Sequence, residues 1–296
     1  MAITVQNHHV EQFKGNVTHL AQQMQSRLRG TVTSEMVTGA LHNFERMGAT
    51  DAVEKTSRNA ATPNIEVPHD RRQVVLREFQ WASLIDRGDQ VKVLIDIAGK
   101  YAQNASAAMG RSWDDLIIAA ALGDATSKVP SGTVGVNTLS TVALPASQTV
   151  AVGTGGDSTM NIGKLLATKE QLLSADIDEY QEQITFVLNS KQLHELLNDT
   201  KITSADYNTV RALVSGSLDE FMGMKFIRSE RITDDATNYS AIAYCTSGIG
   251  LAIGRDVTAR ASERDDLSYS NQIYLEYVAE ATRIEEAKVM EILTVM

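Results

Sequence analysis

Six histidines and one cysteine are the side chains best suited to bind a metal ion or attack a substrate, and none has a catalytic spacing. A zinc-protease helix needs the segment H-E-x-x-H, which is absent from the sequence. Cys245 follows an apolar run at 241–244, where a thiol is more often a small core residue than a nucleophile. The histidines are scattered at His8, His9, His19, His42, His69 and His194. We therefore expect neither a metal site nor a reactive thiol.

Two glycine-rich segments resemble phosphate-binding loops, and each lacks part of the pattern. Residues 248–254 have the spacing G-x-G-x-x-x-G and run into a predicted strand, whereas a dinucleotide fingerprint opens a helix. Residues 153–156 lack the Lys-Ser/Thr pair that completes a phosphate cradle. No G-x-S-x-G segment marks a nucleophilic serine. We expect no catalytic, cofactor-binding or metal-binding residues and no cofactor.

Paired charges are the remaining candidates for chemistry. Adjacent carboxylates can bind Mg²⁺ or act as acid and base, but most such pairs are solvated helix ends and turns. Two close arginines do not make a nucleic-acid patch. We expect the arginine pairs of this chain to form bidentate ion pairs with carboxylates of a neighbouring copy. The pairs are Asp114–Asp115, Asp234–Asp235, Asp265–Asp266, Arg27 with Arg29, and Arg71–Arg72.

Composition limits what this protein can be. A chain of 296 residues with 43% hydrophobic content can bury one large core or two modest ones. Its net charge of −10 opposes a tight grip on a phosphate backbone, and 5% aromatic content is low for stacking on bases. One cysteine allows no intrachain disulfide. Without a long apolar run, we expect neither a membrane span nor a secretory signal.

An arm and a projecting loop are predicted in the first 88 residues. Apolar residues from Val10 to Met24 recur at steps of three and four, which predicts an amphipathic helix. It either packs on its own core or docks on a neighbouring copy, and the segment alone leaves both possible. Pro63 and Pro68 disfavour helix, and the partial alternation at 72–79 favours strand. We interpret residues 45–88 as an extended, projecting hairpin.

A long helix follows, from Asp89 to about Leu122. Its apolar and alanine positions keep near-helical spacing. Gly99 and Gly110 weaken the helix, and we expect a break near Gly110–Arg111. Residues 123–158 lose this periodicity and are rich in Gly, Ser, Thr and Val, so we expect a loop and a weak hairpin.

The remaining sequence predicts mixed α and β structure and then strands. Helices are expected at 165–177, at 193–197 and, opened by a capping box at Thr203–Asp206, through Leu213. Strands are expected at 184–188, 240–245, 248–253 and 273–281, with a charged turn at 260–270. No repeat of fixed period is present, which argues against solenoids and propellers. The expected fold class is α+β.

Three stretches resemble the Hong Kong 97-type fold of tailed-phage major capsid proteins. None is a catalytic motif, and the resemblance rests on their combination and on the order of elements. They are Arg71-Arg72-Gln73-Val74 through Trp81-Ala82-Ser83-Leu84-Ile85-Asp86 with Asp89; Gly110-Arg111-Ser112-Trp113-Asp114-Asp115-Leu116-Ile117-Ile118-Ala119-Ala120-Ala121; and Gly250-Leu251-Ala252-Ile253-Gly254 to Ala281-Thr282-Arg283-Ile284-Glu285-Glu286-Ala287-Lys288-Val289.

The resemblance implies five parts. These are an N-terminal arm (1–44), an extended β-hairpin loop lying over a neighbouring subunit (45–88), a peripheral domain with a long spine helix (89–158), an axial domain facing the capsomer centre (159–249), and peripheral-domain strands (250–296). It implies a non-enzymatic major capsid protein that assembles through pentamers and hexamers into an icosahedral shell around double-stranded DNA.

The resemblance also implies partners and a location. The protein is expected in the virion, after synthesis and assembly in the cytoplasm of a bacterial host. The lysine–asparagine trio that welds some shells cannot be placed here, so we expect non-covalent assembly. The short arm favours a separate scaffolding protein, beside a portal and a possible decoration protein. Packaged DNA would be held without sequence-specific contacts, and no membrane is expected as a partner.

Two other functions stay open from the sequence. An encapsulin-like bacterial nanocompartment shell shares this fold and encloses enzymes instead of DNA. An oligomeric enzyme with an unrecognised pocket would need convergent polar groups, which the sequence does not reveal.

Overall fold

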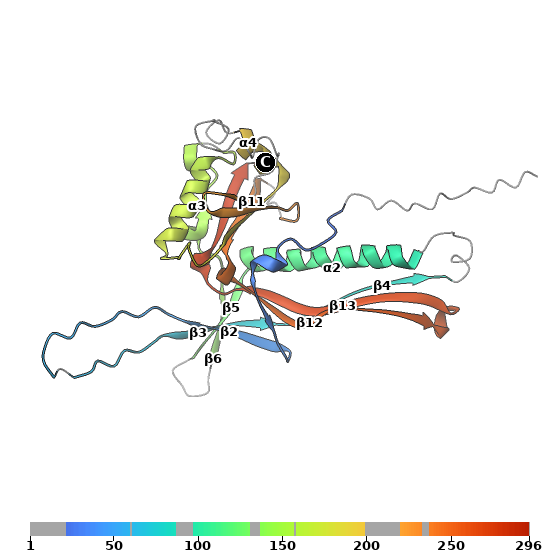
Figure 1. Cartoon of the computed structure of the whole chain (residues 1–296), viewed down its shortest axis with the longest axis horizontal. Coiled ribbons are helices and arrows are strands. Elements are labelled where there is room, and N and C mark those ends of the chain that lie inside the picture. Colours follow the sequence, from blue (N-terminus) through green and yellow to red (C-terminus); the bar gives the residue numbers. More distant parts are fainter. Residues whose placement is uncertain are drawn as a thin grey trace, which may run out of the picture.

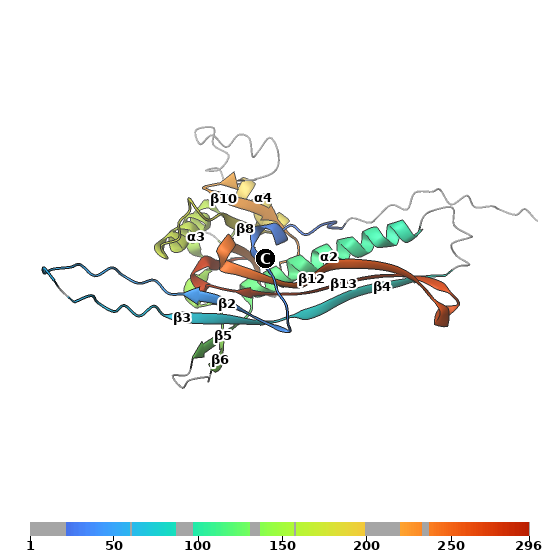
Figure 2. The same ribbon diagram turned by 60° about the horizontal axis from the view of Figure 1, so that its bottom comes forward.

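The computed structural model describes residues 22–59, 61–86, 97–130, 137–156, 158–198, 220–232 and 237–295. The fold combines helices and sheets, as the sequence predicts. The long helix α2 (Ile97–Leu122) lies along an extended hairpin, a second body with α3 and α4 stands beside its C-terminal end, and a loop projects beyond β2 and β3 (Figure 1, Figure 2).

The first sheet supports α2. Its strand order is β1-β12-β13-β4, with parallel pairing of β1 to β12 and antiparallel pairing elsewhere. The expected turn at 260–270 is wrong in extent, because β12 continues to Arg264 and only residues 265–269 turn. Ladder bonds to β13 keep this charged segment extended. The strands are β1 (Thr33–Met36), β4 (Arg77–Ile85), β12 (Ile249–Arg264) and β13 (Ser270–Arg283).

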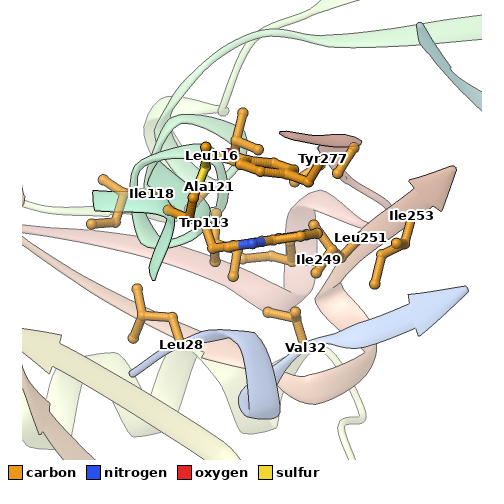
Figure 3. Packing of buried hydrophobic residues seen from close by; sticks show 14 of the residues in the cluster. Leu28, Val32, Trp113, Leu116, Ile118, Ala121, Ile249, Leu251, Ile253 and Tyr277 are labelled. Carbon is orange, nitrogen blue, oxygen red and sulfur yellow. The ribbon is translucent and has the colours of Figure 1, made fainter. Parts of the chain in front are cut away.

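Aromatic stacking joins α2 to this sheet. Trp113 and Tyr277 are almost fully buried, and their ring centroids lie 4.6 Å apart. Phe79 of β4 also stacks on Tyr277, with centroids 4.9 Å apart. Figure 3 shows Leu28 and Val32 beside the same cluster. Each large apolar side chain buried here contributes roughly 1.5–3 kcal/mol.

Helix α2 is continuous through Gly110, so the predicted break is wrong. A Cβ at Gly110 would lie 2.8 Å from the backbone nitrogen of Ser26. The glycine therefore allows the N-terminal segment to approach the helix closely, which is a packing role that helix propensity cannot reveal. The neighbouring Trp113 and Ile117 anchor the helix in the core and offset its weaker propensity.

The second sheet forms a separate core with two helices. Its order is β7-β14-β11-β8-β10-β9, and β8 is buried at every position, as predicted for 184–188. The helix predicted at 165–177 is confirmed as α3 (Ile162–Ser174), which starts where the Asn161 side chain accepts from the Lys164 backbone N–H. The helix predicted at 193–197 is α4 (Ser190–Asn198). The strands are β7 (Thr149–Val150), β8 (Ile184–Leu188), β9 (Glu220–Phe221), β10 (Met224–Arg228), β11 (Asn238–Cys245) and β14 (Val289–Val295).

The C-terminal strand β14 pairs with β11 in this second sheet. The division suggested by the sequence places residues 250–296 together with the strands beneath α2. The chain instead crosses from β13 into the second sheet after Arg283, so the two cores share a continuous C-terminal segment.

The third sheet bears the projecting loop. The predicted hairpin is confirmed, with pairing from Leu41↔Val75 to Met47↔His69. Its root begins at Leu41 instead of residue 45, and the segment 72–79 divides at Leu76 because β4 joins the first sheet. The weak hairpin expected within 123–158 is present as β5 and β6. The sheet order is β2 (Leu41–Met47), β3 (His69–Val75), β5 (Ala125–Pro130) and β6 (Asn137–Val142).

Short 3-10 turns connect these elements at Arg29–Thr31 (η1), Ala146–Gln148, Thr154–Gly156, Thr246–Gly248, Asp265–Leu267 and Glu286–Lys288 (η7). Several sequence predictions lie outside the described residues. They are the arm helix from Val10 to Leu20, the first residues of the long helix at 89–96, the capping box at 203–206 with its helix, the pair Asp234–Asp235, and the histidines His8, His9 and His19.

Candidate assembly surfaces

The loop between β2 and β3 has no cover within its own chain. Every described residue from 48 to 68 is exposed, and none lies in a helix or strand. Apolar side chains occur along it, with Val53 exposed at 63% and Ile65 and Val67 each at 43%. A segment that buries nothing gains no stability from its own subunit, so its apolar side chains are available to a second molecule.

The root of this loop is held by ion pairs that centre on a buried arginine. Arg72 is almost fully buried on β3, and its Nη2 donates to Glu286 Oε1 at 2.6 Å. Arg46 on β2 pairs with Asp70 and donates from Nη1 to Glu286 Oε2 at 3.3 Å. Glu286 therefore ties both strands of the hairpin to η7, and the loop projects from a fixed base.

Arg283 extends the same anchor to the end of α2. Its Nη1 donates to the carbonyls of Ala121 and Gly123, at 3.0 and 2.7 Å, and its Nη2 donates to Val142 O at 2.8 Å. Burial lowers the pKa of this guanidinium, although the Glu286 carboxylate favours its charge. Arginine is suited to this position because its planar fork satisfies several carbonyls at once.

A polar hollow of about 260 Å³ lies at the loop root. Asp70 and Arg46 face one another there, and hydrogen bonds hold the pKa of the Asp70 carboxyl below its ordinary value even though partial burial opposes this. The residues that line the hollow are Arg46, Met47, Gly48, Pro68, His69, Asp70 and Glu285. The charged side chains of Arg46, Asp70 and Glu285 in this lining are already paired within the chain.

The N-terminal segment is clamped on α2 by Asp114. This carboxylate is fully buried and accepts from Ser26 Oγ at 2.6 Å, from the backbone N–H groups of Arg27 and Leu28 at 3.1 Å, and from Gln23 Nε2. The expectation that Asp114–Asp115 is a solvated pair is therefore wrong for Asp114. A carboxylate can leave water when several donors replace its solvation.

Arg111 completes this clamp one turn earlier. Its Nη1 donates to Gln22 Oε1 at 2.8 Å and to Gln23 O at 3.0 Å. The described part of the arm therefore packs on its own chain, and Leu28 is fully buried in the core. Both clamp residues lie in a helix whose periodicity indicated only an apolar face, so nothing in the sequence marked them as anchors.

The predicted arginine forks are formed within the chain. Arg29 donates to both carboxylate oxygens of Asp256, at 3.0 and 2.6 Å, and stacks over Trp113 with 4.5 Å between the guanidinium carbon and the ring centroid. Arg71 pairs with Glu45 at 2.8 Å. The expectation of neighbouring partners is wrong for these arginines, and Arg27 likewise donates to a carbonyl of its own chain. The partners are far away in the sequence, so spacing could not reveal them.

The other chemical candidates are structural in the described residues. Cys245 is a core thiol whose pKa burial raises to about 12, which confirms the expected role. His42 lies 3.0 Å from Glu35, and His194 contacts Asn198. Asp115 pairs with Arg231, and Asp266 with Arg264 in the turn at the tip of the β12–β13 hairpin.

The described residues also form no metal-binding cluster and no phosphate-binding loop. Among the described residues, no three His, Cys, Asp or Glu side chains gather closely enough to hold a metal ion. Residues 249–254 are strand, as expected. Gly155 has φ +79° and packs on Gly163, so the second glycine segment forms a tight turn in front of α3. Within the same residues, no helix has the length and apolar character of a membrane span.

The comparison with known families decides between the alternatives. The profile of the family described as phage capsid protein matches residues 5–295, nearly the whole chain. The chain belongs to the phage capsid protein family. It is a structural protein of the virion, and the encapsulin-like alternative is not favoured. No curated protein matches the chain by sequence.

Solved structures confirm the Hong Kong 97-type capsid fold. The capsid protein of cyanophage P-SCSP1u superposes with a TM-score of 0.76 at 13% identity, covering 100% of this chain and 95% of that one. The capsid protein of Ralstonia phage GP4 gives 0.74 at 10% identity, with 100% and 98% covered. The capsid of cyanophage Pam1 gives 0.71 at 13% identity, with 100% and 99% covered. At these identities the likeness concerns the fold alone.

Proposed function

We propose that this capsid protein is the major shell subunit of a tailed phage. It assembles non-covalently through pentamers and hexamers into an icosahedral shell around double-stranded DNA. The observation that carries the proposal is the loop 48–68, which is exposed at every described position, bears apolar side chains and stands on a root tied by the buried Arg72 and Glu286. An exposed projection with no core of its own is suited to bury its apolar residues on a sister copy.

The two sheets with their helices correspond to the axial and peripheral domains of the proposed shell subunit. The body of the second sheet with α3 and α4, centred on residues 159–249 and joined by β7 and β14, serves as the axial domain. Helix α2 with the first sheet serves as the peripheral domain. The loop 48–68, within the segment 45–88, lies over a neighbouring subunit, and residues 1–44 supply the arm.

The net charge of the chain bears on the other proposed partners. A net charge of −10 suits a shell whose inner face repels DNA weakly, so the genome is enclosed without sequence-specific contacts. A separate scaffolding protein, a portal and a possible decoration protein complete the proposed assembly in the cytoplasm of a bacterial host. We assign no catalytic activity, since the described titratable clusters are paired as structural ties.

The proposal is tested by removing the apolar character of the loop. The variant Val53→Ser, Ile65→Ser, Val67→Ser should fold as the wild type does but yield few particles in electron micrographs and ultracentrifugation. A matched control is Thr50→Ser, Thr56→Ser, Thr62→Ser, which changes three residues of the same loop without removing a large apolar side chain. Normal shells from the first variant would contradict the role of the loop. A wild-type protein that never exceeds a small oligomer, with or without a scaffolding protein, would contradict the proposed function.

A further inference from the structure

The outer edge of the third sheet is formed by a strand that is open to pairing. Strand β6 pairs with β5 on one side and, among the described residues, with no strand on the other. Residues 137–141 are exposed on both faces of the sheet, and Leu139 is exposed at 59%. In both views the β5–β6 hairpin extends from the lower side of the molecule, below β2 and β3 (Figure 1, Figure 2). The backbone N–H and C=O groups along this edge are therefore accessible to another strand.

The other edge strands of the three sheets have features that discourage such pairing. Natural sheets protect their edges with short strands or with charged side chains. Strands β7 and β9 have two residues each, and β1, β2 and β4 include charged residues such as Glu35, Arg46 and Arg77. Strand β6 has neither protection, because the sequence contains no charged residue between Lys128 and Asp157. Two identical copies of β6 can therefore approach each other without electrostatic repulsion.

The sequence of β6 is suited to antiparallel pairing with itself. A two-fold axis normal to the sheet keeps each face of the sheet on its own side, and opposite residues of an antiparallel pair point to the same face. A pairing centred on Leu139 meets this condition and lets the exposed leucines of the two copies cover each other. Short polar side chains then meet on both sides of the leucines, and such pairs stabilise a sheet. The opposite residues are Leu139 with Leu139, Thr138 with Ser140, and Asn137 with Thr141.

We propose that β6 pairs with β6 of a second copy across a two-fold axis centred on Leu139, so that the third sheet continues from one subunit into the next. The inference rests on the proposed function. A two-fold contact joins copies in pairs, whereas a ring of five is built by head-to-tail contacts, so the β6 pair links subunits of neighbouring capsomers. Two paired strands of six residues bury far less than the ~1,200 Å² of a stable interface. The pair therefore forms where a shell holds the two copies together.

Disulfide trapping in assembled shells tests the pairing. In a Cys245→Ala background, shells of Leu139→Cys are oxidised mildly, alkylated and run on a non-reducing gel. Most chains should run as a covalent dimer, because residues opposite each other across the pair lie ~4.5–5.5 Å apart. Thr141→Cys alone is the matched control on the same strand and face, since its two copies would lie about 14 Å apart, too far for a disulfide. Asn137→Cys combined with Thr141→Cys should restore the dimer.

The trapping results separate this inference from the proposed function. Shells of Leu139→Cys that assemble normally and contain only monomers would overturn the β6 pair and leave the proposed function intact. Equal dimer yields from Leu139→Cys and Thr141→Cys would overturn the pair as well, because the two positions cannot both lie at the centre. A wild-type protein that never assembles would overturn the proposed function and this inference together.

A charge at the centre of the pair gives a second readout. Leu139→Lys places like charges directly opposite each other, so its shells should come apart at a lower urea concentration than wild-type shells, and added salt should narrow the difference. Val129→Lys on β5, where the valine is exposed at 42%, adds the same charge one strand away from the edge and should leave the shells as stable as wild type. Circular dichroism of unassembled subunits verifies that both variants fold. Wild-type stability of the Leu139→Lys shells would also overturn the inference.

Discussion

Residues 22–28 and residues 48–68 both run outside helices and sheets, yet the chain holds them in opposite ways. The first segment inserts Leu28 into the core, and the buried Asp114 accepts from the backbone N–H groups of Arg27 and Leu28. The second is exposed at each described position and is fixed only at its root. Irregular structure is held in place where the subunit provides both burial and hydrogen bonds. Where the subunit provides neither, the segment stays exposed.

The largest expected effect is the truncation of Leu28. Leu28→Ala should lower the free energy of unfolding of unassembled subunits by roughly 2–5 kcal/mol, because it leaves a cavity beside α2. Val53→Ala in the loop should change it by less than about 0.5 kcal/mol, because an exposed side chain leaves no cavity. Urea titration followed by tryptophan fluorescence measures both. Equal losses in the free energy of unfolding for the two variants would show that residues 22–28 contribute no more to stability than the loop 48–68 does.

Removing the carboxylate of the clamp should have the next largest effect. Asp114→Ala is expected to cost roughly 2–4 kcal/mol, since buried N–H donors of Arg27 and Leu28 lose their acceptor. Asp115→Ala, next to it, breaks a half-exposed pair with Arg231 and should cost less than about 1 kcal/mol. If the two variants unfold at the same urea concentration, the clamp does not stabilise the segment.

A methyl group at Gly110 should disturb the same contact from the helix side. Gly110→Ala improves helix propensity by about 1 kcal/mol. It also places a Cβ 2.8 Å from the Ser26 nitrogen, a contact with rigid backbone. We expect a net loss of roughly 1–3 kcal/mol, because the segment must move away. Gly30→Ala, where no atom lies within 4 Å of the new Cβ, is the control in urea titration. A stabilised Gly110→Ala protein would show that the close approach is dispensable.

The smallest effect should be the pH dependence of the Arg29–Asp256 fork. Hydrogen bonding from Arg29 lowers the pKa of Asp256 below its ordinary value of 3.8. The stabilisation is therefore fully present above that value and is lost as pH falls through the lowered pKa. Asp256→Asn should melt slightly below the wild type at pH 7, and the two melting temperatures should converge in acid. Arg29→Gln should converge in the same way, whereas parallel melting curves for wild type and variants would exclude the linkage.

Local patterns in the sequence determined most of the regular elements. Helical spacing located α2 and α3, a continuous apolar run located β8, and alternation located β13. These elements can be predicted because the apolar residues of a helix or a strand recur with a fixed period over a short stretch of sequence. The exposed, proline-containing character of the loop 48–68 was also readable, since it depends on residues within the segment. The capsid family resemblance followed from the order of such elements.

Tertiary structure alone decided which groups meet. Asp114 is buried because residues 23–28, nearly ninety positions earlier in the chain, bring their donors to it. Gly110 continues the helix because the same segment lies against it, and Arg29 pairs with Asp256 instead of a sister copy. The C-terminal strand joins β11 of the second sheet. Sequence spacing encodes local periodicity, whereas these contacts depend on how distant elements pack.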